Sequence, residues 1–202
     1  MFTGIVDHCA IITAISVEKH STQLTISTQF TDLALGESVC VDGICLTVTA
    51  LDRDQFQCDL SSETLQLTCA KNYLIGAAVN VERAMKMHDR LSGHMVTGHV
   101  DGILKVSAID KEGDFVVCEF SDVLKKHCLL LTEKGSVCVN GVSLTINRLG
   151  NSSFSVMLIP HTLQRTNLGV LTKNNFVNVE YDYLAKLVQR NLSHTRSENY
   201  VA

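Results

Sequence analysis

An internal repeat constrains the fold of this chain more than any other feature of its sequence. Residues 1–7, MFTGIVD, return as MVTGHVD at residues 95–101. Residues 38–48, SVCVDGICLTV, return as SVCVNGVSLTI at residues 136–146, and the offset between the copies is now four residues larger. Two more blocks match in the same order, 63–68 with 161–166 and 79–82 with 177–180. Four ordered matches identify a tandem duplication, so the chain is expected to form two related units.

The seam between the copies lies near residue 93. We therefore expect one domain at residues 1–93, a second at 94–183 and a C-terminal segment at 184–202. The change of offset places a four-residue insertion in the second copy, between its first two matched blocks.

Each copy is expected to be built of short β-strands. Val-, Ile- and Thr-rich segments separated by turn residues predict strands in the first copy at 23–27, 38–41, 46–50, 55–60 and 78–82. Asp42-Gly43 and Asn140-Gly141 predict tight hairpins, because both residue types tolerate the positive φ of a primed turn. One short helix per copy is expected, before the last strand or between strands, as at residues 120–130. The strand spacing indicates an all-β small barrel or sandwich.

The C-terminal segment changes to a helical period. Leu184, Leu187, Val188 and Leu192 follow an i, i+3, i+4, i+8 pattern, which predicts one apolar stripe on a helix. Such a helix either covers the end of a barrel or associates with other copies of the chain. Residues 193–202 are polar and are expected to fray.

Eight cysteines and eight histidines raise the question of a metal site or a disulfide scaffold. No Cys-x-x-Cys pair occurs, and Cys40 and Cys45 are an odd number of residues apart, so we expect them on opposite faces of a strand. A disulfide scaffold is typical of small secreted chains, and residues 1–20 lack a signal-peptide pattern. We expect no metal, and reduced, mostly buried cysteines in a cytoplasmic protein.

Charge and hydropathy exclude two classes of partner. The formal net charge is −4 and no basic stripe occurs, so nucleic acid is not an expected partner. No stretch approaches 18 apolar residues, so no membrane span is expected.

Comparison of the two copies indicates where chemistry has been added. Ile5 corresponds to His99, Cys45 to Ser143 and Ala84 to Asp182, so the second copy has gained an imidazole, a hydroxyl and a carboxylate. These are the groups that proton transfer and nucleophile activation require. Each also has an ordinary structural interpretation, as a strand histidine, a turn serine and a helix cap respectively.

Seven stretches, in order over residues 1–182, carry a resemblance to a known family: 1–6, 45–48, 79–83, 93–101, 141–145, 159–162 and 178–182. In these stretches the chain closely resembles riboflavin synthase of the alpha-chain type. The resemblance implies tandem six-stranded Greek-key β-barrels followed by a C-terminal α-helix that assembles a homotrimer. It implies that two molecules of 6,7-dimethyl-8-ribityllumazine exchange a four-carbon unit, giving riboflavin and 5-amino-6-(D-ribitylamino)uracil, without cofactor or metal. The reaction site would lie between the N-terminal barrel of one subunit and the C-terminal barrel of a neighbour.

The resemblance also implies two substrate pockets. The N-terminal pocket would use Gly4, Ile5, Val6, Cys45, Leu46, Thr47, Asp59, Leu60, Ser61, Ser62, Glu63 and Thr64. The C-terminal pocket would use Gly98, His99, Val100, Lys134, Ser143, Leu144, Thr145, Ile159, Pro160, His161, Thr162, Leu163 and Gln164. Hydroxyl-bearing side chains suit a ribityl chain. The expected base that deprotonates one lumazine is His99, Thr145 or Ser143. The expected group for adding a nucleophile at C7 of the other lumazine is Ser143 with Asp182 nearby, and Cys45 in the N-terminal pocket is the alternative.

Two departures and one alternative accompany this resemblance. Ser92 and Asn140 stand where the family commonly has Gly and Asp. The alternative function is that of a lumazine protein, an antenna that binds a lumazine or flavin on the same framework without turnover. His99, Ser143, Thr145 and Asp182 favour the enzyme. Association with a lumazine-making capsid is a further partner that the sequence leaves open.

Overall fold

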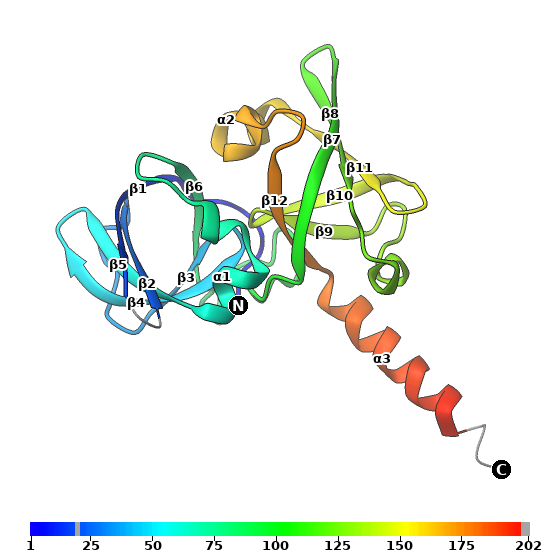
Figure 1. Cartoon of the computed structure of the whole chain (residues 1–202), viewed down its shortest axis with the longest axis horizontal. Helices are drawn as coiled ribbons and strands as arrows, with labels where there is room; N and C mark the ends of the chain where they lie inside the picture. Colours follow the sequence, from blue (N-terminus) through cyan, green and yellow to red (C-terminus); the bar gives the residue numbers. More distant parts are fainter. Residues whose placement is uncertain (19–20, 199–202) are drawn as a thin grey trace.

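Two closed antiparallel β-barrels lie side by side, followed by a helix that projects from the second (Figure 1). The computed structural model describes residues 1–18 and 21–198. The first barrel consists of β1 (His8–Val17), β2 (Ser21–Ser27), β3 (Ser38–Val41), β4 (Ile44–Asp52), β5 (Gln55–Ser61) and β6 (Ala78–Arg83). Between β5 and β6 lie the short helix α1 (Ser62–Leu67) and the 3₁₀ turn η1 (Cys69–Asn72).

The second barrel repeats this order element by element. Its parts are β7 (Gly102–Glu112), β8 (Phe115–Ser121), η2 (Lys125–Leu130), β9 (Ser136–Val139), β10 (Val142–Leu149), β11 (Phe154–Leu158), α2 (Pro160–Arg165), η3 (Asn167–Val170) and β12 (Phe176–Tyr181). The strand order β1-β2-β5-β4-β3-β6 recurs as β7-β8-β11-β10-β9-β12. Even the irregularities recur, because register shifts at Ile12/Ala14 and Val48/Ala50 return at Val106/Ala108 and Ile146/Arg148.

Some local predictions need correction. The helix expected at residues 120–130 is wrong, because Phe120 belongs to β8 and only the 3₁₀ turn η2 follows. The short helix of each copy is α1 or α2, just before the last strand. The four-residue insertion falls between β8 and β9, where η2 is found and the first copy has no helix. The predicted strands are confirmed with ends shifted by up to two residues, and β1 was not predicted.

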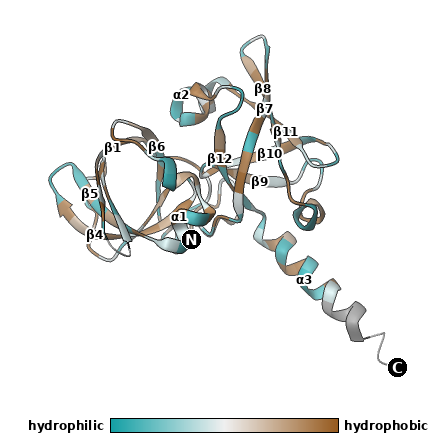
Figure 2. Cartoon of the chain, in the orientation of Figure 1, coloured by the Kyte–Doolittle hydropathy of each residue, from teal (hydrophilic) through white to brown (hydrophobic). Residues whose placement is uncertain are grey.

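Each barrel encloses its own apolar core. Alternate side chains of every strand point inward, so Leu24, Phe56 and Leu60 are fully buried in the first barrel, and Phe120 and Val156 in the second. The strands in Figure 2 are accordingly rich in hydrophobic residues, whereas α3 shows both colours. This burial is the main stabilising contribution in each barrel.

The two barrels meet along matched residues of the repeat. Phe2 and Val96 form an antiparallel bridge, with backbone N···O distances of 2.8 and 3.1 Å. The predicted hairpins are confirmed, since Asp42 and Gly43 have φ of 47° and 83° and Asn140 and Gly141 have 46° and 77°. The two turns pack against each other, because a Cβ on Gly43 would lie 3.0 Å from the Gly141 nitrogen. The interface is therefore a pseudo-twofold contact between equivalent turns.

Asp42 and its equivalent Asn140 occupy the same place in this interface but differ in charge. Asn140 Oδ1 accepts from the Asn178 backbone N–H at 2.8 Å. Asp42 Oδ1 accepts from the Asn80 backbone N–H at 2.7 Å and from Asn167 Nδ2 at 2.8 Å. The Tyr73 hydroxyl donates to Asp42 Oδ2 at 2.9 Å. Burial nevertheless dominates and raises the pKa of the Asp42 carboxyl to about 7.

Asp42→Asn is expected to flatten the pH dependence of folding. Between the ordinary aspartate pKa and about 7, the folded chain retains a proton that the unfolded chain has lost. The free energy of unfolding therefore falls as the pH rises through this window, by on the order of a few kcal/mol. Urea unfolding of the unaltered chain and of Asp42→Asn at about pH 5 and about pH 8 measures how the free energy of unfolding changes with pH. Asn140→Asp is the matched reverse variant and should steepen this change; equal slopes in all three chains would contradict the assignment to Asp42.

The helix α3 (Tyr183–Glu198) confirms the predicted change of period. Asp182 accepts from the Leu184 backbone N–H at 2.8 Å, and Lys186 Nζ lies 2.6 Å from Asp101 Oδ2, so the first turn is attached to the second barrel. The rest of the helix points away from both barrels (Figure 1). Its apolar stripe is exposed, at 56% for Leu184, 43% for Leu187, 58% for Val188 and 57% for Leu192. Residues 199–202 of the expected frayed tail lie outside the described residues.

Candidate functional site

The segments that precede the two barrels cross over to the opposite barrel. The backbone N–H of Cys45, on β4 of the first barrel, donates to the Gly98 carbonyl at 2.8 Å. The backbone N–H of Ser143, on β10 of the second barrel, donates to the Gly4 carbonyl, also at 2.8 Å. Gly98 therefore lies at the first barrel and Gly4 at the second.

This crossing corrects the expected grouping of the pocket residues. Val100 packs against the core of the first barrel, and Val6 is part of the core of the second. The prediction that 4–6 belongs with Cys45, and 98–100 with Ser143, is wrong. The two segments exchange places because they pair with each other at Phe2 and Val96 on the pseudo-twofold axis.

Each crossed segment is held by a buried carboxylate from the last strand of its own copy. Glu82 Oε1 accepts from Thr3 N at 2.6 Å and Thr3 Oγ1 at 2.7 Å, and its Oε2 accepts from Gly4 N at 2.9 Å. Glu180 holds Thr97 and Gly98 by the same three contacts, at 2.8, 2.6 and 2.9 Å. Burial raises the pKa of Glu82, and its three donors oppose that shift.

Glycine is required where each segment passes the opposite barrel. Gly98 has φ +80°, and a Cβ on it would lie 2.5 Å from Cys45 Cβ. Gly4 has φ +77°, and its Cβ would lie 2.6 Å from Ser143 Cβ. The backbone therefore passes directly against the strand, and the polar groups of both glycines are used in holding it there: Gly98 bonds to Glu180 and Cys45, and Gly4 to Glu82 and Ser143.

A cavity of about 270 Å³ opens where α1 meets the crossed segment at the first barrel. Its lining combines predicted residues from both of the expected pockets: Cys45, Glu63, Thr64, Gly98, His99 and Val100. Ser61 caps α1, and its Oγ accepts from the Thr64 backbone N–H at 3.1 Å. The exposed His99 imidazole is thus brought together with Cys45 and separated from Ser143.

At the second barrel, Ser143 is paired with a histidine that the repeat did not reveal. His94 Nδ1 lies 2.7 Å from Ser143 Oγ. His94 is 8% exposed, and burial lowers the pKa of its imidazole, while the nearby Asp182 carboxylate acts in the opposite direction. The imidazole is therefore neutral at pH 7, and in the tautomer with its hydrogen on Nε2, Nδ1 accepts the serine proton.

The other nitrogen of His94, Nε2, is buried and has no hydrogen-bond partner within residues 1–18 and 21–198. A buried N–H without a partner is costly, which is characteristic of a functional site. Gly93 makes the approach possible, because a Cβ there would lie 2.1 Å from the Thr3 carbonyl oxygen. The departure at Ser92 falls on an exposed residue and leaves Gly93 in place.

His94 was missed because it lies just outside the repeat. The matched block of the second copy begins at Met95, so His94 has no equivalent in the first copy. Comparison of the two copies can identify only positions that are present in both copies and differ between them, so it could not identify His94. The remaining sequence signal was the Gly93-His94 pair itself, since a glycine beside a histidine allows close backbone approach.

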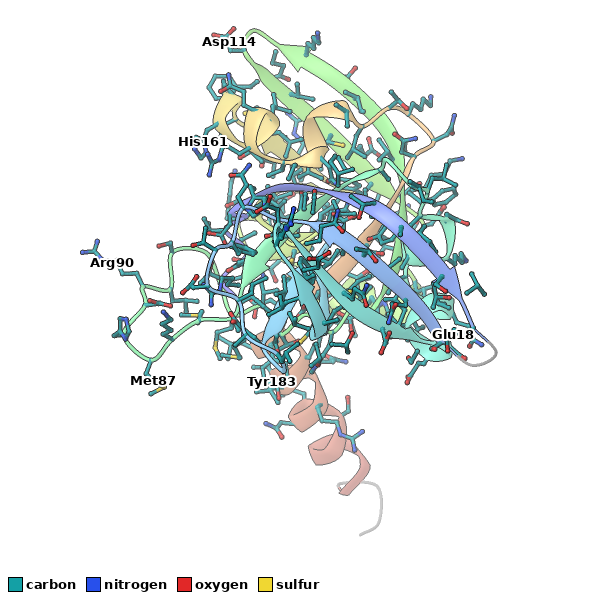
Figure 3. The ribbon with its side chains drawn as sticks, turned by 90° about the vertical axis from the view of Figure 1, so that its left-hand side faces the viewer. Glu18, Met87, Arg90, Asp114, His161 and Tyr183 are labelled. Carbon is teal, nitrogen blue, oxygen red and sulfur yellow. The ribbon has the colours of Figure 1, made fainter. Side chains whose placement is uncertain are left out.

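The remaining predicted residues fall into two groups. The side chains of Leu46, Leu60 and Leu144 point into the barrel cores, so at these positions only the backbone is available to a ligand. The polar or surface positions are Thr47, Asp59, Ser62, Lys134, Thr145, Ile159, Pro160, His161, Thr162 and Gln164, whereas Leu163 is half-buried against the core of the second barrel. Pro160 opens α2, and His161 on that helix points outward in Figure 3. The same view shows the loop with Met87 and Arg90 extending from the barrels.

The duplicated barrels and their crossed pockets define a lumazine-binding protein, whose family model, the lumazine binding domain, matches residues 3–84 and again 97–182. The chain is 39% identical to the riboflavin synthase of Bacillus subtilis (strain 168) over 202 residues, covering 98% of this chain and 93% of the relative. It is 37% identical to the riboflavin synthase of Photobacterium phosphoreum, covering 98% and 92%. The chain belongs to the riboflavin synthase family.

Solved structures give the same fold. The protein LumP complexed with riboflavin superposes with a TM-score of 0.83 at 26% identity, covering 90% of this chain and 99% of that one. LumP complexed with 6,7-dimethyl-8-(1'-D-ribityl) lumazine gives a TM-score of 0.81 at 25% identity, with the same coverage.

Neither a membrane-spanning helix nor a metal-binding cluster occurs among the described residues. No helix among the described residues is long and apolar enough to cross a membrane. Within residues 1–18 and 21–198, no group of three or more His, Cys, Asp or Glu side chains is arranged to hold a metal ion.

Proposed function

We propose that this chain is a riboflavin synthase that converts two molecules of 6,7-dimethyl-8-ribityllumazine into riboflavin and 5-amino-6-(D-ribitylamino)uracil. The observation that carries the proposal is a pair of equivalent but chemically different side-chain groupings. At the first barrel Cys45 and His99 line one cavity, and at the equivalent position of the second barrel Ser143 Oγ lies 2.7 Å from His94 Nδ1. A reaction that consumes two copies of one substrate in different roles needs two such related sites.

The two pockets suit different steps of this exchange. Ser143, with its proton taken by His94, adds to C7 of one lumazine or activates a hydroxide that does so, and Asp182 stabilises the imidazolium formed. His99 removes a proton from the acidic C7 methyl group of the other lumazine. The methyl carbanion of that molecule then attacks the activated one, and a four-carbon unit passes between the rings. Holding the two rings face to face contributes much of the rate.

The pockets of one chain open beside different barrels, and the proposal includes an assembly that brings two together. The exposed apolar stripe of α3 supports a homotrimer in which the first barrel of one subunit faces the second barrel of a neighbour. Association with a lumazine synthase belongs to the same proposal as a partner that would supply substrate. A cytoplasmic location is supported by the eight cysteines, all of which are free thiols.

A non-catalytic lumazine- or flavin-binding protein is the second candidate, because the LumP structures have the same fold. The Ser143–His94 pair favours the enzyme, since binding alone does not need a serine held 2.7 Å from a neutral imidazole.

Incubation of the purified chain with 6,7-dimethyl-8-ribityllumazine distinguishes the two candidates. The enzyme is expected to produce riboflavin and 5-amino-6-(D-ribitylamino)uracil in equal amounts, with two lumazines consumed for each riboflavin. Product is followed by chromatography, and Ser143→Ala is the control. Tight lumazine binding without turnover would instead identify the binding protein.

A further inference from the structure

The hairpin between β3 and β4 places two thiols directly opposite each other. Cys40 on β3 and Cys45 on β4 are cross-strand partners in the register. The prediction that they face opposite sides is wrong, because the chain reverses at Asp42-Gly43 between them. Directly opposite residues of an antiparallel pair point to the same face of the sheet.

The hydrogen bonds identify this as the closer of the two kinds of cross-strand pair. The Cys45 backbone N–H donates to Gly98, so it is not exchanged with Cys40. In such a non-hydrogen-bonded pair the Cα atoms lie about 4.5 Å apart, which is within the range of about 4.4–6.8 Å that disulfides span. The Cys45 side chain also packs against the buried cluster that contains Cys40.

The two sulfurs differ in accessibility. Cys45 is half-buried and lines the cavity beneath α1, where a small oxidant can reach it. Cys40 is 1% exposed, and burial raises the pKa of its thiol well above the ordinary value. An oxidant therefore meets Cys45 first, and Cys40 is placed to resolve the product.

We propose that Cys45 and Cys40 form a reversible disulfide under peroxide, which removes the Cys45 thiol from the first pocket and switches that pocket off. In the first step the Cys45 thiol loses its proton and the thiolate attacks hydrogen peroxide; the O–O bond breaks, a sulfenic acid forms, and the leaving hydroxide takes up that proton as water. In the second the Cys40 sulfur attacks the sulfenic sulfur, the S–O bond breaks, and a second water leaves with the Cys40 proton. Two thiols are oxidised and one peroxide is reduced to two waters.

The switch is confined to one pocket. The equivalent pair in the second barrel is Cys138 opposite Ser143, which cannot form a disulfide. The consequence for turnover rests on the proposed function, whereas formation of the disulfide does not.

Peptide mapping of the full chain tests the bond directly. Trypsin releases residues 20–53 as one peptide that contains Cys40 and Cys45 and no other cysteine. After mild hydrogen peroxide and alkylation of the remaining thiols, this peptide is expected to be two hydrogens lighter and unalkylated, and dithiothreitol should reverse both changes. Turnover should fall and recover in parallel. If the peroxide-treated chain shows no disulfide in this peptide, the proposal is overturned. If the disulfide forms but turnover is unchanged, only the switch is overturned.

Two variants give matched controls. Cys40→Ala removes the resolving thiol, so the peptide should gain oxygen at Cys45 instead of losing hydrogen. Ser143→Cys supplies the missing thiol opposite Cys138, so the peptide of residues 135–148 should gain the same reversible disulfide. A link between Cys40 and Cys138, seen as two joined peptides, would overturn the proposal.

Discussion

His94→Ala is expected to lower lumazine turnover by about 10²–10⁴-fold, which is the usual contribution of a general base. Without His94, no imidazole lies at 2.7 Å to take the Ser143 proton. Lumazine binding should change little, because the loss falls on the chemical step, so kcat should fall more than KM rises. Steady-state kinetics at several pH values measures both quantities.

The pH profile separates this role from a structural one. Burial lowers the pKa of His94, so the acid limb of kcat/KM should lie below pH 6.5, the ordinary pKa of histidine. That limb should disappear in the variant. His88→Ala is the control, since the His88 side chain is 81% exposed on the 84–93 loop. Near-native turnover of a folded His94→Ala chain would remove His94 from the mechanism.

Leu187→Lys combined with Leu192→Lys is expected to convert the proposed trimer into monomers. Each leucine of the stripe is exposed in the single chain, at 43% and 57%. Fully burying an exposed leucine contributes about 1.5–3 kcal/mol, and these two are roughly half exposed, so two in each of three chains amount to roughly 5–9 kcal/mol for the assembly. Sedimentation velocity at micromolar concentration measures the state, and turnover should fall with the trimer if the reaction site spans two subunits.

The same substitution on the polar face of α3 is the control for this prediction. Gln189→Lys adds a charge away from the stripe and should leave the trimer intact. Thermal unfolding should show that the barrels stay folded in both variants, because α3 is attached to the second barrel through its first turn and η2. If the unaltered chain sediments as a monomer, the assembly part of the proposed function is wrong.

The architecture was predictable from the sequence because the duplication provides two copies of each weak strand pattern, and the copies support the same prediction. No single strand of this chain is a strong prediction, but matched blocks at 38–48 and 136–146 fix two equivalent hairpins at once. Two equivalent all-β units and the primed turns were predictable on this basis, whereas the closed barrels came from the family resemblance and the C-terminal helix from its own period. No α-helix spans 120–130, since an apolar run suits either a strand or a helix; β8 ends at Ser121 and the 3₁₀ turn η2 occupies Lys125–Leu130.

The site was less predictable because its residues meet across the copies. Gly4 and Cys45 lie in the same copy of the sequence, yet each pairs with the other copy through a backbone hydrogen bond. Such bonds depend on how two barrels dock, which local patterns do not encode. Cys40 and Cys45 show the same limit at short range, where strand parity was applied without the intervening turn.

The crossed segments also bear on how such a chain arose. With Gly4 serving the second barrel and Gly98 the first, the molecule has the arrangement of an arm-exchanged dimer whose two partners were later joined end to end. A single ancestral unit would have needed a twin to complete its pocket, since its own arm reaches away from it. Fusion then freed the halves to diverge, and the replacement of Cys45 by Ser143 at the equivalent position is the kind of asymmetry that an exchange between identical partners could not have acquired.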